Sequence, residues 1–235
     1  MAIKMEPGVY IVGTPIGNLS DIGLRALEPL RSAEIILAED TRHTARLLAR
    51  YEVRAKLVSC HRFNEASRVR MVMAKIRSGA RVALVTNAGM PSVSDPGARM
   101  VCACRKEGVS VRVVPGPSAA TAAVAASGFG GSGFHFEGFL PRKPGARGKR
   151  LEELAKEPCP VVLFESPYRV GALMGELAVA LGRREVFVGR ELTKLNEECL
   201  WGTAAELEAE FLGRASGKSA RLLKGEIVVV WAPAA

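Results

Sequence analysis

Residues that could bind and position a small ligand concentrate at positions 81–97, which read RVALVTNAGMPSVSDPG. An apolar run at 82–85 stops abruptly at a segment rich in Gly, Pro, Ser and Asn, as a buried parallel strand does when it ends at a ligand crevice. In open α/β sheets such crevices lie beyond the carboxyl ends of the strands. Glycines at 89 and 97 would let the backbone approach a ligand, because they lack a Cβ. The polar groups would come from Asn87, Ser92, Ser94 and Asp95.

Carboxylates follow other expected strands in the same way. Glu39 and Asp40 come directly after an apolar run at 35–38. They could be catalytic, could bind a ribose or could cap the next helix, and capping is the default. Because alternate side chains of a strand face opposite ways, at most one of the two acids would face a ligand. Glu165 and Glu191 hold similar positions later in the chain, and Lys194 follows Glu191 by three residues.

A glycine-containing turn, GTPIGNL at 13–19, follows the first expected strand. Its backbone N–H groups could hold a ligand, but a plain strand-to-helix connection has the same composition. The sequence of this turn favours neither reading.

Two basic segments could contact phosphate. Positions 142–150 carry five positive residues and no acid, and their Pro and Gly residues predict an exposed, mobile loop. Such a loop could be merely solvated, or it could bind nucleic acid. Arg42, Arg46 and Arg50 recur every four residues and form a second basic stripe. The three histidines have no metal-ligand spacing, so no metal site is expected.

The composition is that of a folded chain with an anionic partner. Of 235 residues, 33 are Lys or Arg and 24 are Asp or Glu, which gives a formal charge of +9. An apolar share of 48% supports an ordinary core and excludes a disordered chain. Five cysteines without C-x-x-C spacing predict no disulfide framework. No segment resembles a signal peptide or a bilayer span, so we expect a cytoplasmic protein.

The order of expected elements indicates an α/β fold. In the first half, short apolar strands alternate with helical segments, which predicts a parallel sheet. The second half contains expected strands at 161–164, 185–188 and 225–231 and helices ending at 181 and 212. We expect two domains, residues 1–118 and 119–235, with a ligand cleft between them.

Eight segments, taken in order, resemble one family. They are GTPIGNLSDI (13–22), EDTRHTARLL (39–48), GMPSVSDPG (89–97), PGPSA (115–119), EGFLPRK (137–143), ESPYR (165–169), RELTKLNEE (190–198) and KGEIVVV (224–230). They look like the signatures of the ribosomal small-subunit RNA methyltransferase I family, in the tetrapyrrole-methylase-like class of S-adenosylmethionine (SAM) enzymes. The resemblance covers nearly the whole chain. It implies 2′-O-methylation of a cytidine ribose in the decoding centre of 16S rRNA, a homodimer, a mostly parallel N-terminal sheet and a mixed C-terminal sheet.

The resemblance also implies roles for particular residues. The residues implied to bind SAM, the methyl donor, are Pro15, Asn87, Ala88, Gly89, Met90, Ser94, Ser118, Ala119, Glu165, Ser166, Arg190 and Leu192. The basic residues expected to bind RNA are Arg42, Arg46, Arg142, Lys143, Arg147, Lys149 and Arg150. Methyl transfer to a hydroxyl is an in-line displacement in which a proton must be taken up. The candidates for that role are Asp95, Lys194 and Glu191, and the sequence does not rank them.

The chain departs from the family pattern at positions 86–87. The family usually has Ser-Asp where this chain has Thr86-Asn87. Asn87 keeps an acceptor oxygen but loses the negative charge, which predicts weaker binding of the donor's amino group. Two rival functions stay open at this point: a porphyrinoid C-methyltransferase of the same class, and an RNA-binding assembly factor without catalysis.

Overall fold

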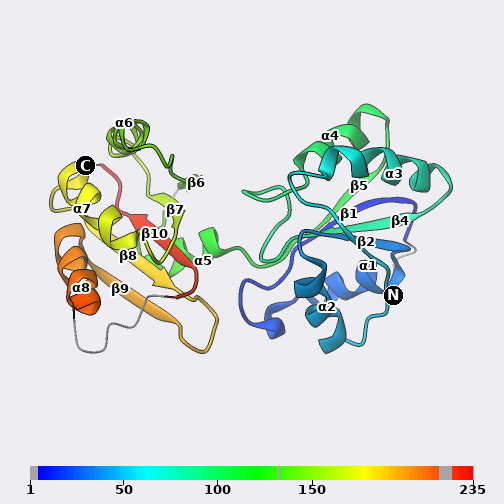
Figure 1. Cartoon of the computed structure of the whole chain (residues 1–235), viewed down its shortest axis with the longest axis horizontal. Coiled ribbons are helices and arrows are strands. Elements are labelled where there is room, and N and C mark those ends of the chain that lie inside the picture. Colours follow the sequence, from blue (N-terminus) through cyan, green and yellow to red (C-terminus); the bar gives the residue numbers. More distant parts are fainter. Residues whose placement is uncertain (1–4, 132, 217–223, 235) are drawn as a thin grey trace. The chain divides into compact units, whose positions relative to one another are not determined.

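A computed structural model describes residues 5–131, 133–216 and 224–234 of the chain. The chain divides into two compact units, Met1–Ser118 and Ala119–Ala235, and Figure 1 shows the elements of each. The elements of the first unit are β1 (Gly8–Val12), two 3-10 turns (Leu19–Asp21 and Leu24–Ala26), α1 (Leu27–Ser32), β2 (Ile35–Ala38), α2 (Thr41–Arg50), β3 (Leu57–Ser59), α3 (Glu65–Arg77), β4 (Arg81–Val85), α4 (Ala98–Lys106) and β5 (Val111–Val114).

The sheet of the first unit is entirely parallel. Its strand order is β3-β2-β4-β1-β5, and β1 pairs with both β4 and β5. Every residue of β1 and β2 is buried, because helices cover both faces of the sheet. On one face α1 and α2 pack through residues such as Leu30 and Leu47, and on the other α3 and α4 pack through Val72 and Met100 (Figure 1).

The second unit holds a mixed five-stranded sheet of order β6-β7-β10-β8-β9. Only β6 and β7 run parallel, and β10 lies antiparallel between β7 and β8. Helix α5 covers one face, while α6, α7 and α8 cover the other. Its elements are α5 (Ala119–Ser127), β6 (His135–Phe139), α6 (Pro144–Leu154), β7 (Val161–Glu165), α7 (Val170–Leu181), β8 (Glu185–Arg190), β9 (Glu198–Thr203), α8 (Ala204–Ser216) and β10 (Ile227–Trp231).

The predicted fold class is confirmed: a parallel N-terminal sheet and a mixed C-terminal sheet, each flanked by helices. Most of residues 142–150 are exposed, as predicted, but the prediction that they form a loop is wrong. Pro144 starts helix α6, and Arg147, Leu151 and Leu154 form its buried face at helical spacing. The proline and two glycines looked like loop residues, but proline suits the first turn of a helix.

No helix within the described ranges is both long and apolar enough to cross a bilayer. In the same ranges, His, Cys, Asp and Glu side chains do not gather into any group of three or more that could hold a metal ion.

Candidate functional site

The loops after β1 and β4 are joined by hydrogen bonds at the carboxyl edge of the parallel sheet. Thr14 and Gly89 exchange both backbone hydrogen bonds, with N···O distances of 2.9 and 3.1 Å. The buried Thr14 hydroxyl also donates to the Thr86 carbonyl oxygen at 3.2 Å. Gly89 has φ +77°, which a side chain would strain. The segment 87–90, expected to bind SAM, therefore lies against the turn that carries Pro15.

The loop after β5 joins the same cluster through two glycines. A Cβ built on Gly13 would lie 2.6 Å from the Cα of Gly116 and 2.6 Å from the sulfur of Met90. A Cβ on Gly116 would lie 2.7 Å from the carbonyl carbon of Gly13. The ends of β1 and β5 thus touch backbone to backbone, and the two glycines are what permits this contact. The structure brings Pro15, Asn87, Gly89 and Met90 together with the turn that leads to Ser118 and Ala119.

Two polar atoms of the loop after β4 are buried without a protein partner. They are Oδ1 of Asn87 and Oγ of Ser92. A buried acceptor that lacks a donor costs free energy, so a ligand donor would be favoured at Asn87. The loop also holds Ser92 and Ser94 at φ +72° and +61°. Such backbone strain in non-glycine residues is typical of functional loops.

Glu39 and Asp40 have separate tasks, as their alternation on the strand predicts. Glu39 accepts a hydrogen bond of 3.0 Å from the Thr86 hydroxyl, next to Asn87. Asp40 caps α2 by accepting from the backbone N–H of Arg42 at 2.8 Å. The Arg42 side chain also pairs with Asp40 and, together with that cap, lowers the Asp40 pKa to about 2. Asp40 is therefore a helix cap, and only Glu39 reaches the expected donor loop.

In the second unit, two residues predicted to bind SAM, Glu165 and Arg190, are the last residues of β7 and β8. Glu165 of β7 and Arg190 of β8 both register with Ile227, on opposite sides of β10. The loops that follow them, with Ser166 and Leu192, therefore start at the same edge. Leu192 packs against the small cluster under α5.

The side chain of Glu165 is committed to a buried ion-pair network. It is 1% exposed and contacts Arg147 Nη1 at 3.2 Å, while Arg169 Nε donates to it at 2.7 Å. Arg147 also pairs with Glu176 of α7. Any contact of Glu165 with SAM would therefore involve its backbone rather than its carboxylate. The same holds for Arg190, whose guanidinium pairs with Glu198 at 3.0 Å.

Glu191 and Lys194 form an ion pair, with Nζ and Oε1 2.6 Å apart. Glu191 also accepts from the backbone N–H of Glu226, and Gly225 leaves the room for its carboxylate. Burial acts to lower the pKa of Lys194, but hydrogen bonds to Glu191 and Glu226 outweigh it and leave that pKa above its usual value. For Glu191 burial acts to raise the pKa, and the bonds from Lys194 and Glu226 lower it overall. Lys194 is thus a protonated ammonium at neutral pH.

The residues expected to bind RNA fall into two groups. Those with exposed side chains are Arg42, Arg46, Arg142, Lys143 and Lys149. Arg147 is buried, so its placement on an RNA-binding surface is corrected: its guanidinium serves the network around Glu165. Arg150 is partly buried and pairs with Glu137 and Glu153.

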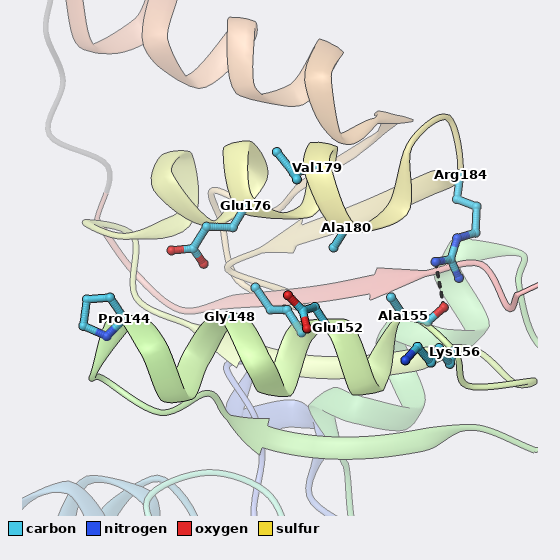
Figure 2. A pocket seen from close by; sticks show the side chains of 10 residues that line it. Pro144, Gly148, Glu152, Ala155, Lys156, Glu176, Val179, Ala180 and Arg184 are labelled. Atoms are coloured by element: carbon cyan, nitrogen blue, oxygen red, sulfur yellow. Dashed lines mark hydrogen bonds between the residues drawn. The ribbon is translucent and has the colours of Figure 1, made fainter.

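A groove of about 750 Å³ lies between α6 and α7 of the second unit. Figure 2 shows Glu152, Glu176, Lys156 and Arg184 along it, with Arg184 donating to the Ala155 carbonyl oxygen at 2.7 Å. Acids and bases balance there, and none of the expected donor-binding residues lines it. The groove is therefore distinct from the expected donor site.

Sequence reasoning did not single out Thr14 or Glu65. Glu65 is buried, and its carboxylate accepts from the backbone N–H of Met100 at 3.0 Å, in the first turn of α4. It supplies the acceptor that Gly97, which precedes the helix, cannot. This role depends on a tertiary contact between Glu65 and the start of α4, which the sequence alone does not show.

Comparison with known proteins places the chain in a family. Residues 8–208 match the model of the Tetrapyrrole (Corrin/Porphyrin) Methylases. The chain therefore belongs to the tetrapyrrole methylase family, and the resemblance of its motifs is confirmed.

Two of its relatives in that family bear the same name. The chain is 48% identical to ribosomal RNA small subunit methyltransferase I of Thermotoga maritima over 203 residues, 86% of this chain and 91% of that one. It is 44% identical to the protein of the same name from Mesorhizobium japonicum, over 99% of this chain and 78% of that one. A crystal structure of uroporphyrin-III-C-methyltransferase from Thermus thermophilus matches with a TM-score of 0.68 at 22% identity, covering 96% and 94% of the two chains. That likeness shows the fold alone.

Proposed function

We propose that this protein transfers the methyl group of SAM to the 2′-hydroxyl of a cytidine ribose in the decoding centre of 16S rRNA. The observation that carries the proposal is the 48% identity to ribosomal RNA small subunit methyltransferase I over 86% of the chain. The excess of basic residues agrees with an RNA substrate. Such a substrate belongs to the cytoplasm, and a homodimer stays a prediction from the resemblance.

The first unit offers a cradle that fits SAM. Gly13, Gly89 and Gly116 bring three backbone segments into one cluster, with the sulfur of Met90 beside Gly13. Beside them the buried Oδ1 of Asn87 lacks a donor, which the amino group of SAM would provide. Bound SAM supplies an electrophilic methyl group on its sulfonium sulfur. In the second unit we propose contacts from Ser166 and Leu192, and backbone contacts at the ends of β7 and β8.

The residues of the chain must align the ribose hydroxyl and accept its proton. Lys194 is unsuited to accept a proton, because the ion pair with Glu191 keeps it protonated. Glu191 already accepts two hydrogen bonds through Oε1. Asp95, in the strained loop after β4, and Glu191 therefore stay the proposed candidates for the proton acceptor. If alignment supplies most of the rate, substitution of Asp95 will cost less than about 10²-fold, the lower limit for a general base.

Incubation of the protein with methyl-labelled SAM and small ribosomal subunits tests the proposal. We expect label in 16S rRNA and, after nuclease digestion, in a 2′-O-methylcytidine. Label only in uroporphyrinogen would instead support a porphyrinoid C-methyltransferase. Label in neither would favour a non-catalytic assembly factor.

A further inference from the structure

An exposed aromatic ring follows β3, at the carboxyl edge of the first sheet. Phe63 is 80% exposed, and the guanidinium of Arg62 lies over its ring at 4.4 Å from the centroid. The edge of His61 approaches the same ring, with centroids 6.0 Å apart. Such exposure leaves room for a second planar group on the ring. The pair Arg62–Phe63 thus presents a ring and a guanidinium plane, the two groups on which nucleic-acid bases stack.

The turn that carries Phe63 is held from several sides. The backbone N–H of Phe63 donates to Nδ1 of His61 at 3.3 Å, and the side chain of Asn64 accepts from His61 N at 2.8 Å. Asn64 also donates to the carbonyl oxygen of Ser59, the last residue of β3. The next residue, Glu65, is bonded to the first turn of α4. A ring on so constrained a turn loses little conformational entropy when it binds.

The charge around this ring suits a polyanion. In the sheet order, β3, β2 and β4 are neighbours, and each is followed at this edge by an exposed arginine: Arg62, Arg42 and Arg99 respectively. Arg42 is paired with Asp40. Two strand spacings, about 10 Å, separate β3 from β4, whose loop holds Asn87 and Asp95. A nucleic-acid strand that has one nucleotide at the β4 loop could reach the β3 turn with a neighbouring one.

We propose that Phe63 and Arg62 bind an unpaired RNA base that flanks the methylated nucleotide, by stacking it on the phenylalanine ring. The inference rests on the proposed function, because it assumes an RNA substrate. The ring of Phe63 contacts the polar side chains of Arg62 and His61, which suits a stacked base better than an apolar protein partner. Stacking tolerates any base, so this contact would position the RNA without reading its sequence.

Kinetics with small ribosomal subunits test the stacking. We expect Phe63→Ala to raise KM for the subunits about ten-fold or more, the effect of one lost stacked base, with kcat and the Kd for SAM little changed. Phe63→Trp should stay within about three-fold of the unsubstituted protein, since tryptophan also stacks. Phe63→Leu keeps the apolar bulk without the π face, and it should behave like Phe63→Ala. Val179→Ala, which shortens an 89% exposed side chain in the second unit, is the matched control and should change nothing.

Other results would overturn the proposal. One is an unchanged KM for Phe63→Ala; another is a Phe63→Leu variant as good as Phe63→Trp, which would mean an apolar contact without stacking. A change in molar mass of Phe63→Ala in light scattering would assign the ring to an interface between copies of the chain. Direct binding of a labelled single-stranded RNA without SAM keeps the two proposals separable. If no methyl transfer occurs but Phe63→Ala still weakens RNA binding about ten-fold, the proposed reaction fails and the stacking site stands.

Discussion

Gly13 and Gly116 meet backbone to backbone at the ends of β1 and β5, where a Cβ on either would lie within 2.8 Å of main-chain atoms of the other. No flexible side-chain end is available to move aside for a main-chain clash of this kind. The two loops of the proposed SAM site can therefore lie this close only because neither residue has a side chain.

Gly116→Ala should weaken SAM binding by about ten-fold or more, because the two loops must separate to make room for the Cβ of the alanine. Isothermal titration calorimetry with SAM measures this directly. Gly145→Ala is the matched control, since a Cβ there meets nothing within 4 Å and alanine suits a helix. Equal SAM affinity for Gly116→Ala and the unsubstituted protein would show that this contact does not shape the donor site.

Asn87→Asp should tighten SAM binding by about five-fold, because a charged acceptor bonds the donor's amino group more strongly. The same change should lower the unfolding temperature of the protein without SAM, since the Oδ1 position is buried and lacks a partner. Calorimetric titration and thermal unfolding check the two halves separately. An unchanged or larger Kd would mean that Asn87 does not contact the amino group.

The Lys194–Glu191 pair should stabilise the second unit over a defined pH range. The Glu191 pKa is lowered on folding, so its contribution is present above about pH 4.5 and disappears as the pH falls through the folded value. The Lys194 pKa is raised, so its contribution holds below about pH 10.5 and disappears as the pH rises through the folded value. The unfolding free-energy difference between the unsubstituted protein and Lys194→Met should therefore be constant from about pH 6 to 9 and shrink beyond both ends.

A second substitution at position 194 bears on catalysis. Lys194→Arg keeps the positive charge, and we expect its kcat to stay within about ten-fold of the unsubstituted value. A loss of about 10² to 10⁴ in kcat would instead make Lys194 a general base.

Arg147→Met should destabilise the protein by about 1.5–3 kcal/mol, because the buried carboxylate of Glu165 loses one charged hydrogen-bond donor and keeps Arg169. The exposed Arg142 is the matched comparison. Arg142→Ala should leave stability unchanged but weaken RNA binding. It should also reduce the slope of log affinity against log salt concentration by about one. Denaturant unfolding and RNA titrations at several salt concentrations distinguish the two. A stable Arg147→Met variant with weakened RNA binding would return Arg147 to the RNA-binding surface.

The alternating pattern of the first half predicted the parallel sheet because fully buried strands leave long apolar runs, as at β4. The pattern missed β6, β9 and α6. Half-exposed strands such as β9 lack such a run, and α6 has a Pro-Gly start that also suits a turn. Charge was the least reliable guide to the site. Arg147 and Lys149 look alike as basic residues, but Arg147 lies on the buried face of α6 with Leu151 and Leu154, where Glu165 pairs with its charge, and Lys149 faces the solvent.

The strand order of the first unit has a consequence for how the chain acquires its structure. Tyr10 of β1 pairs with Arg112 of β5, 102 residues later, whereas Arg190 and Glu198 of the β8–β9 pair are only 8 residues apart. Contacts between distant residues form slowly, since a long loop must close first. During synthesis β1 must wait for β4 and β5 to emerge, and its apolar residues stay exposed meanwhile. We therefore expect β8 and β9 to gain amide protection before β1 when refolding is followed by pulsed hydrogen exchange.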